Sequence, residues 1–209
     1  MRYKAIFKSW KVDLLFNVKL IPFQTAKEKD IRLPSDIVPL SYNLQLVPFI
    51  IPDNFTISGA VSIELACLGD TTNITLHSKQ KEINSLNVLD SSGIELAIDS
   101  KYLDPERDFL VVQMRDPLSA GSNYTLEIEF VSDLNEGLSG FYRSTYTEDD
   151  GKKMTIATTH FEPTSARKAF PCFDEPALKA TFEISLGRTR DMVALSNMPI
   201  KEGQRGMEM

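Results

Sequence analysis

Residues 159–177 hold the densest group of side chains that could do chemistry, in the run Thr-His-Phe-Glu-Pro-Thr-Ser-Ala-Arg-Lys-Ala-Phe-Pro-Cys-Phe-Asp-Glu-Pro-Ala. Within it, Glu162 is a carboxylate that precedes a stretch able to form one helical turn. An acid at this place is typical of a helix start, where the helix dipole favours negative charge. The residues alone therefore favour a helix-start acid at Glu162 over a functional role.

The two histidines, His77 and His160, do not form a metal site by spacing. Zinc sites combine three or four ligands, commonly in closely spaced pairs, and neither histidine has such a partner. His77 alternates with Leu76 and Ser78, which predicts a solvent-facing strand position. The sequence also lacks a glycine-rich phosphate loop and a Gly-x-Ser-x-Gly nucleophile motif. We therefore assign no metal ligand and no catalytic residue to this chain.

Alternation of apolar and polar residues dominates the chain from residue 40 onward. Such a period of two predicts strands with one buried and one solvated face. It is clearest over residues 40–46, 61–67, 124–130 and 182–186. Clusters of Gly, Pro, Asn and Asp separate these runs, as in an antiparallel sandwich or barrel.

Two local signals complete the predicted fold. The turn Asp149-Asp150-Gly151 predicts a hairpin that joins residues 141–146 to 154–158. Residues 164–169 predict a single helical turn, because a proline lies on each side of them. We therefore predict an all-β fold, a large antiparallel β-sandwich with one short helical turn.

Composition indicates a globular protein. The 209 residues are 42% hydrophobic and 25% charged, as in ordinary globular domains. Residues 1–30 carry seven Lys or Arg against three Asp or Glu and no sustained period, so we expect a basic, poorly specified extension there and the β-domain over residues 31–209. The net charge of -6 argues against a nucleic-acid partner, which would favour a basic surface.

The cysteines and the Asn-x-Thr triplets bear on the compartment. Cys67 and Cys172 could form one disulfide or remain two buried thiols, and the size of the domain favours thiols because it needs no covalent staple. Asn54, Asn73 and Asn123 each begin an Asn-x-Thr triplet and could accept glycans in the secretory pathway.

Targeting signals in the chain are weak. The apolar stretch 12–23 is interrupted by Asp13 and Lys19, whereas a signal peptide needs roughly 7–15 apolar residues. The uncharged stretch 37–52 contains three prolines and is shorter than the ~20 residues of a membrane span. The residues leave both a secretory and a cytosolic location open.

Four segments resemble, in order, the N-terminal domain of the zinc aminopeptidase family that includes aminopeptidase N and the endoplasmic-reticulum aminopeptidases. They are Leu-Pro-x-x-x-x-Pro-x-x-Tyr within residues 31–44, Gly-Phe-Tyr-Arg-Ser within 137–144, the run at 159–177, and Ala-Leu-Ser-Asn-Met-Pro at 194–199. This resemblance implies a saddle-like β-domain over about residues 31–203. It also implies a location in the secretory pathway, at the cell surface or in the endoplasmic-reticulum lumen.

In that family, zinc binds in a separate domain with Gly-Ala-Met-Glu-Asn and HExxH motifs, and neither motif occurs here. Residues 206–209 do not match the family, so we expect the last strands of its domain to be missing. By resemblance, the chain alone binds no catalytic zinc and hydrolyses nothing.

The resemblance also assigns roles to two residues. It implies that Glu162 binds the free α-amino group of a peptide substrate, which is largely charged at neutral pH because its pKa is about 7.7–8.0. His160 occupies a position where members commonly have Gln, or Asp when they prefer acidic first residues. Because histidine titrates near pH 6.5, we expect His160 to change the first-residue preference and to make it pH-dependent.

A second interpretation is a non-catalytic β-sandwich interaction module, such as a short isoform or fragment that associates with the full-length enzyme. Alternating strands fit it equally well, because a fold does not fix a function. Missing C-terminal strands would also leave a sheet edge and an apolar face uncovered. We therefore expect the isolated chain to associate.

Overall fold

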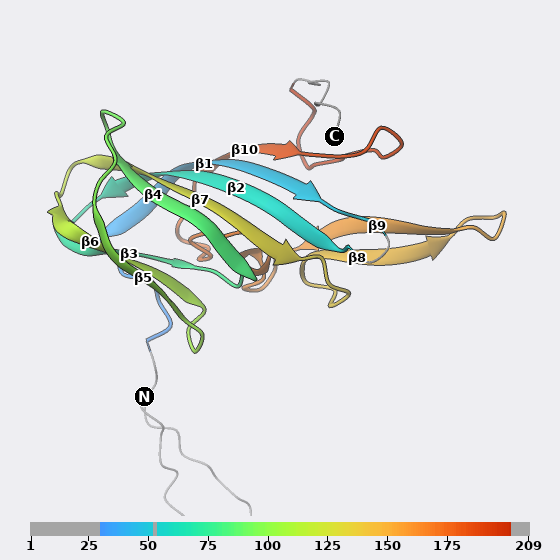
Figure 1. Ribbon diagram of the computed structural model, residues 1–209, viewed down its shortest axis with the longest axis horizontal. Coiled ribbons are helices and arrows are strands. Elements are labelled where there is room, and N and C mark those ends of the chain that lie inside the picture. The colour runs from blue at the N-terminus through green and yellow to red at the C-terminus, as the bar shows by residue number, and fades with distance from the viewer. Residues whose placement is uncertain (1–29, 52–53, 202–209) are drawn as a thin grey trace, which may run out of the picture. The chain divides into compact units, whose positions relative to one another are not determined.

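The strands form two stacked sheets and a projecting hairpin (Figure 1). The computed structural model describes residues 30–51 and 54–201, and the elements fall in Arg32–Met209, the second of the chain's two units. The larger sheet has the order β10-β1-β2-β7-β4, the smaller sheet β3-β6-β5, and β8 pairs with β9. The elements are β1 Ile37–Pro48, β2 Thr56–Cys67, β3 Thr71–His77, β4 Glu82–Asp90, β5 Ile98–Asp104, β6 Phe109–Leu118, β7 Asn123–Asp133, β8 Gly140–Thr147, β9 Lys153–His160, the 3-10 turn η1 Ala166–Lys168 and β10 Thr181–Leu186.

The core lies between the two sheets and confirms the predicted all-β fold. In the antiparallel pair β2–β7, Val61 lies opposite Ile128 and Ile63 opposite Leu126. These four side chains are at most 2% exposed, while Glu127 on the alternate face is exposed. Burying each such aliphatic side chain contributes about 1.5–3 kcal/mol, so the alternation predicted for 61–67 and 124–130 sets the register.

The alternation predicted for residues 40–46 is wrong at its first position. Leu40 is 39% exposed, because the β1–β2 register shifts between Pro39 and Ser41. Such a bulge moves the preceding side chains to the other face of the sheet. The predicted buried face therefore begins at Tyr42.

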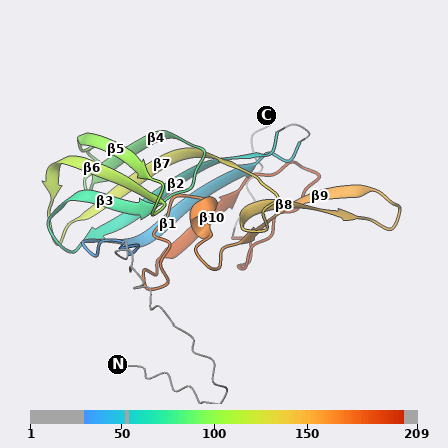
Figure 2. The ribbon, with the colours of Figure 1, turned by 90° about the horizontal axis from the view of Figure 1, so that it is seen from below.

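Strand β10 differs from its prediction in two ways. It pairs with β1 in parallel, with Phe182 beside Tyr42 and Ile184 beside Leu44. Although Tyr42 and Leu44 are buried, Phe182 remains 51% and Ile184 46% exposed. The reason is position: β10 is at the edge of the larger sheet, and the smaller sheet lies under the opposite part of it (Figure 2).

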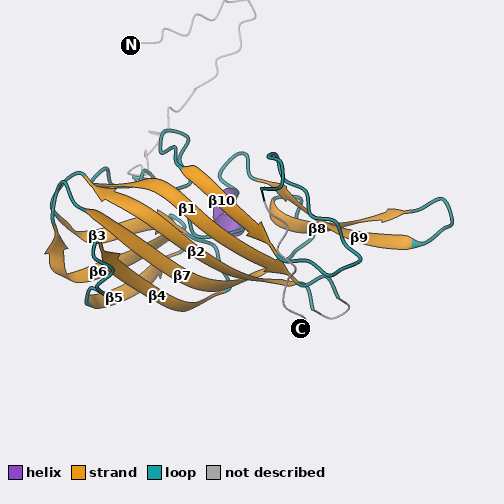
Figure 3. Cartoon of the chain, turned by 90° about the horizontal axis from the view of Figure 1, so that it is seen from above, coloured by secondary structure: helices purple, strands orange, loops and turns teal. Residues whose placement is uncertain are grey.

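The predicted hairpin and helical turn are both present. The β8–β9 hairpin turns through Gly151, whose φ is 85° and whose N–H donates to the Glu148 carbonyl at 2.9 Å. It projects beyond the stacked sheets, and η1 lies near its base (Figure 3). The helical turn is shorter than predicted and covers Ala166–Lys168.

His77 corrects the prediction of a solvent-facing strand position, because it is only 1% exposed. The chain after η1 runs alongside the end of β3: the His77 N–H donates to the Cys172 carbonyl at 2.8 Å, and the Cys172 N–H donates to the His77 carbonyl at 3.0 Å. Alternation within β3 could not reveal this distant neighbour. Cys172 and Cys67 are both buried free thiols.

The exposed apolar side chains of β10 should make the isolated chain self-associate. We expect sedimentation velocity to show a concentration-dependent rise in mean mass. Ile184→Lys should reduce it, because a charge on this face opposes apolar contact. Ser185→Lys, on the alternate face of the same strand, is the matched control and should reduce it less. A monodisperse monomer at every concentration would contradict the expectation.

Candidate functional site

Glu162 lies on a tight turn just after β9. The Ser165 N–H donates to the Phe161 carbonyl at 2.8 Å and closes the turn, and Thr164 adopts a left-handed φ of 57°. Helix η1 starts only at Ala166, with no acidic residue in its first turn. The interpretation of Glu162 as a helix-start acid is therefore wrong, and its side chain is exposed to solvent.

Arg167 is a buried cation that ties η1 to its neighbours. Its side chain is 9% exposed. The Nε donates to Asp174 Oδ2 at 2.9 Å, and Nη1 lies 3.5 Å from Asp108 Oδ2. An unpaired buried charge costs several kcal/mol, so these two carboxylates hold the guanidinium and, with it, the turn that precedes it.

The carbonyl groups of η1 are also bound by other segments. The Gln80 Nε2 donates to the Arg167 carbonyl at 2.8 Å, and the Lys79 N–H donates to the same oxygen at 2.9 Å. The Ser132 hydroxyl donates to the Lys168 carbonyl at 3.0 Å. Such carbonyls have no partner within a short helix. The backbone that follows Glu162 is therefore fixed from the β3–β4 connection and from β7.

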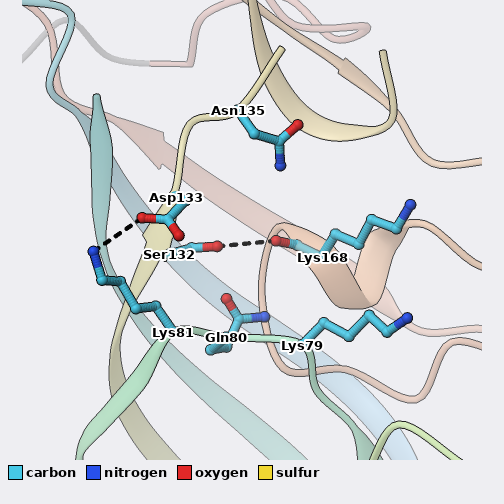
Figure 4. Close-up of a pocket in the computed structure, with 7 residues that line it drawn as sticks. All are labelled: Lys79, Gln80, Lys81, Ser132, Asp133, Asn135 and Lys168. Atoms are coloured by element: carbon cyan, nitrogen blue, oxygen red, sulfur yellow. Dashed lines mark hydrogen bonds and ion pairs between the residues drawn. The ribbon is translucent and has the colours of Figure 1, made fainter. Parts of the chain in front are cut away.

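A hollow of about 230 Å³ lies beside these contacts (Figure 4). It is lined by Lys79, Gln80, Lys81, Ser132, Asp133, Asn135 and Lys168. Its three ammonium groups each contact another side chain, that of Asp108, Asp133 or Ser139, at 2.8–3.1 Å. The hollow therefore belongs to the support of the turn, and Glu162 is not among its lining residues.

The ring of His77 accepts a hydrogen bond through Nδ1 from the Asp174 N–H at 3.2 Å. An accepting Nδ1 requires a neutral ring with the proton on Nε2. Burial, and next the charge of Arg167, lower the pKa of His77 from 6.5 to about 4. His77 therefore acts as a neutral support of residues 172–174, the later part of the 159–177 run.

Glu175 joins two of the predicted motifs. Its Oε1 accepts the Leu33 N–H at 2.7 Å, and its Oε2 lies 2.7 Å from Arg32 Nη2. Since the carboxylate is only 10% exposed, it anchors the 31–44 motif to the 159–177 run.

His160 lies two residues before Glu162, opposite Gly140 in the β8–β9 ladder. It is exposed, and its Nδ1 lies 3.3 Å from the Leu138 carbonyl oxygen. A carbonyl only accepts, so Nδ1 donates here and the neutral ring leaves Nε2 as an acceptor.

Gly140, which pairs with His160, lies against η1. A Cβ at Gly140 would lie 2.7 Å from the Cβ of Lys168, and φ there is 74°. Glycine thus permits the close packing of the hairpin base on η1.

An exposed aromatic surface adjoins the Glu162 turn. Phe161 contacts Phe170 edge to face, Phe170 contacts Phe182, and Phe182 stacks on Tyr42 with centroids 4.4 Å apart. Phe161 is 37% and Phe182 51% exposed. These two exposed rings are joined through Phe170, which is only 4% exposed, so aromatic packing links β10 to the residue next to Glu162.

The three Asn-x-Thr triplets occupy different settings. Asn73 in β3 and Asn123 at the start of β7 are exposed, while Asn54 is partly buried. The Thr56 hydroxyl donates to the Asn54 Oδ1 at 2.8 Å. The structure thus brings none of them to Glu162 or His160.

The described residues contain neither a candidate metal site nor a membrane-spanning helix. No group of three His, Cys, Asp or Glu side chains in residues 30–51 and 54–201 could hold a metal ion, so the zinc of the resembled family has no fitting ligands among them. In the same ranges, no helix is long and apolar enough to span a membrane.

Comparison with known proteins identifies the family. A family model described as the Peptidase M1 N-terminal domain matches residues 38–208. The chain belongs to the M1 peptidase N-terminal domain family. Because that match spans η1, β10 and both partners of the β8–β9 hairpin, the Glu162 turn lies within the family domain.

Three relatives of this M1 domain are much longer proteins. Aminopeptidase N of Canis lupus familiaris is 40% identical over 181 residues, covering 80% of this chain and 18% of that protein. Glutamyl aminopeptidase of Rattus norvegicus is 41% identical over 183 residues, 86% of this chain and 19% of the relative. The human thyrotropin-releasing hormone-degrading ectoenzyme is 38% identical over 172 residues, which cover 82% of this chain and 16% of that protein. The chain therefore spans less than a fifth of these relatives' lengths.

The supporting residues of this M1 domain were harder to find from sequence than Glu162 itself. Gln80, Ser132 and Asp108 contact residues of the 159–177 run that are 36 or more positions away in the sequence. No local pattern indicates such contacts. The buried polar character of Gln80 and Ser132 becomes visible only once the strands are placed.

His77 should make the stability of the M1 domain pH-dependent. In the unfolded chain it titrates near 6.5, and in the folded chain near 4. Between these values only the unfolded state takes up the proton. The stabilisation is therefore complete above about pH 6.5 and is lost as pH falls towards about 4, by up to roughly 3 kcal/mol.

Urea unfolding across this range tests the effect. His77→Asn keeps an acceptor for the Asp174 N–H but cannot titrate, so its free energy of unfolding should fall less steeply below about pH 6.5 than that of the unmodified chain. His160→Asn, which removes the exposed second histidine, is the matched control for the substitution itself. Equal slopes for the unmodified chain and His77→Asn would contradict the assignment.

Proposed function

We propose that residues 31–209 are the part of a zinc aminopeptidase that closes one side of its active-site cleft, where Glu162 binds the α-ammonium group of a peptide. The observation that carries the proposal concerns the three acids of the 159–177 run. Asp174 is paired with Arg167 and Glu175 with Arg32. Glu162 is exposed and has no hydrogen-bond or ion-pair partner among the described residues. Its charge is thus available to a ligand.

The rigidity of the support favours this role. A binding group acts best when neighbouring contacts fix its position before the ligand arrives. The buried Arg167 pair and the bound carbonyls of η1 fix the chain at Arg167 and Lys168, the fifth and sixth residues after Glu162. An ammonium group at this turn would meet one carboxylate at a fixed distance from the peptide end. This arrangement suits an exopeptidase.

His160 is proposed to contact the first side chain of the peptide. It is exposed, lies two residues from Glu162 and leaves Nε2 available. The residues of this chain supply binding and orientation only. Zinc, when bound in the complete enzyme, would supply the activated water, and none of the described residues is assigned to it.

A second candidate is an interaction module that docks on another protein surface, including the full-length enzyme. The exposed apolar side chains of β10 and Phe161 favour it. The same surface is where a further domain would pack in the first proposal. Activity measurements therefore separate the two better than binding measurements do.

A secretory location is part of the proposal. The name of the human relative describes it as an ectoenzyme, and three Asn-x-Thr triplets lie in the chain. Peptide N-termini are the proposed ligands, and no nucleic acid is expected because the net charge is -6.

Glu162→Gln should impair the complete enzyme selectively. A charged hydrogen bond contributes about 1.5–3 kcal/mol, so kcat/KM for an aminoacyl substrate should fall roughly 10- to 100-fold. Glu129→Gln, an exposed acid on the outer face of β7, is the matched control and should leave kcat/KM unchanged. Unaltered kcat/KM in Glu162→Gln, with the same thermal stability, would refute the role and favour the interaction module.

His160→Gln should remove a pH-dependent change in first-residue preference. A protonated imidazole would attract an acidic first side chain, so the unmodified enzyme should cleave acidic first residues relatively better at about pH 6 than at about pH 8. The ratio of kcat/KM between acidic and neutral first residues measures this in a panel of substrates. If the ratio in the unmodified enzyme equals that of His160→Gln at both pH values, His160 does not contact the first side chain.

A further inference from the structure

We infer that Asn73 and Asn123 are acceptors of N-linked glycans, at the end of the domain opposite to the Glu162 turn. The inference rests on the secretory location that is part of the proposed function, and it does not rest on the role proposed for Glu162. It starts from the two triplets Asn73-Ile-Thr75 and Asn123-Tyr-Thr125, which meet the minimal requirement for transfer of a glycan to asparagine. The structure adds where these side chains stand and whether they are free.

Both side chains are available. Asn73 and Asn123 are exposed, and neither side-chain amide has a hydrogen bond to any described residue. The neighbours of Asn73 along β3 are different, because Ile74, Leu76 and His77 are at most 1% exposed. Asn73 is therefore the only exposed residue of β3. A bulky hydrophilic glycan can stand there without disturbing the core.

The two asparagines flank one pair of connected loops. The Ala120 N–H donates to Asp70 Oδ1 at 2.8 Å, and the Gly121 N–H donates to the Cys67 carbonyl at 2.8 Å. These loops lead into β3 and β7, which start at the end of the stacked sheets away from the β8–β9 hairpin (Figures 1 and 2). Glycans at both positions would leave the Glu162 turn and β10 uncovered.

A glycan on Asn73 would also protect a sheet edge. In the smaller sheet, β3 is an edge strand with the order β3-β6-β5. Edge strands offer unpaired backbone groups to other chains, and proteins commonly block them. Asn123, by contrast, begins a strand that lies between β2 and β4, so its glycan would cover the loop end.

Asn54 is set apart from the other two. It is partly buried, and its Oδ1 accepts the Thr56 hydroxyl at 2.8 Å. The adjoining Phe55 packs under the Arg143 guanidinium, 4.0 Å from the ring centroid, at the base of the hairpin. We therefore exclude Asn54 from the proposal and use it as the matched control.

The reaction requires a co-reactant from outside the chain, a lipid-pyrophosphate-linked oligosaccharide, and the transferase of the secretory pathway. The asparagine Nδ2 bonds to the anomeric carbon of the first sugar and loses one proton. The bond from that carbon to the pyrophosphate oxygen breaks, and the lipid pyrophosphate leaves. No oxidation or reduction takes place.

The test expresses the full 209-residue chain behind a cleavable secretory signal in animal cells and compares gel mobility before and after treatment with peptide N-glycosidase. We expect two glycans on the unmodified chain, one on Asn73→Gln, one on Asn123→Gln and none on the double variant. Asn54→Gln should retain two.

Peptide mapping after enzymatic release in heavy-oxygen water should place the labelled aspartates at positions 73 and 123. This readout separates loss of the site from poor folding, because it is made on the unmodified chain. A secreted chain that carries no glycan, or whose single mobility step is lost only in Asn54→Gln, would overturn the inference. Activity of the complete enzyme does not enter the test.

Discussion

The buried charge of Arg167 is the constraint on which the candidate site depends. A guanidinium that is 9% exposed must be paired, because leaving a charge buried and alone costs several kcal/mol. Asp174 and Asp108 supply the pairing from the segment after η1 and from the β5–β6 turn. Asp108 itself adopts a left-handed φ of 58°. The ion pairs of Arg167 therefore join the strained β5–β6 turn to the irregular segment around η1. The chain that leads from β9 into β10 is thereby held against the stacked sheets.

The same network explains why one acid remains available. Within twenty residues, Asp174 and Glu175 are drawn into ion pairs by Arg167 and Arg32, and the ring of His77 stays neutral because burial disfavours its charged form. These groups stabilise the fold and have no charge to offer a ligand. Glu162 lies on the exposed side of a turn whose other side is anchored. Glu162 and Glu175 are the same type of residue, so it is burial that decides which carboxylate supports the fold and which is available to a ligand.

Sequence alone predicted what depends on neighbours along the chain. The alternation of β2 and β7 and the Asp149-Asp150-Gly151 hairpin were predicted correctly, because period and turn chemistry decide them locally. The helical turn was predicted at the right place but is shorter than expected. The prediction of a solvent-facing position for His77 was wrong, because the backbone at Cys172, ninety-five residues away, pairs with the backbone of His77. The prediction of a buried position for Phe182 was wrong, because β10 is an edge strand and the described residues leave this face of it about half exposed. The period of a strand does not reveal whether the strand lies at an edge. For the site, the motif located Glu162, but its support from Gln80 and Ser132 required the fold.

The exposure of Glu162 also limits what this domain can bind by itself. An ion pair in water contributes about 0–1 kcal/mol, because solvent screens it. The proposed contact with an ammonium group becomes strong only when both groups lose water. Phe161 and the aromatic contacts that lead to β10 place exposed apolar surface directly beside the turn. A second domain packed on that surface would bury it and would exclude water from Glu162 in the same step. Affinity for a peptide end is therefore expected to arise from the assembled cleft, with this domain supplying a fixed carboxylate.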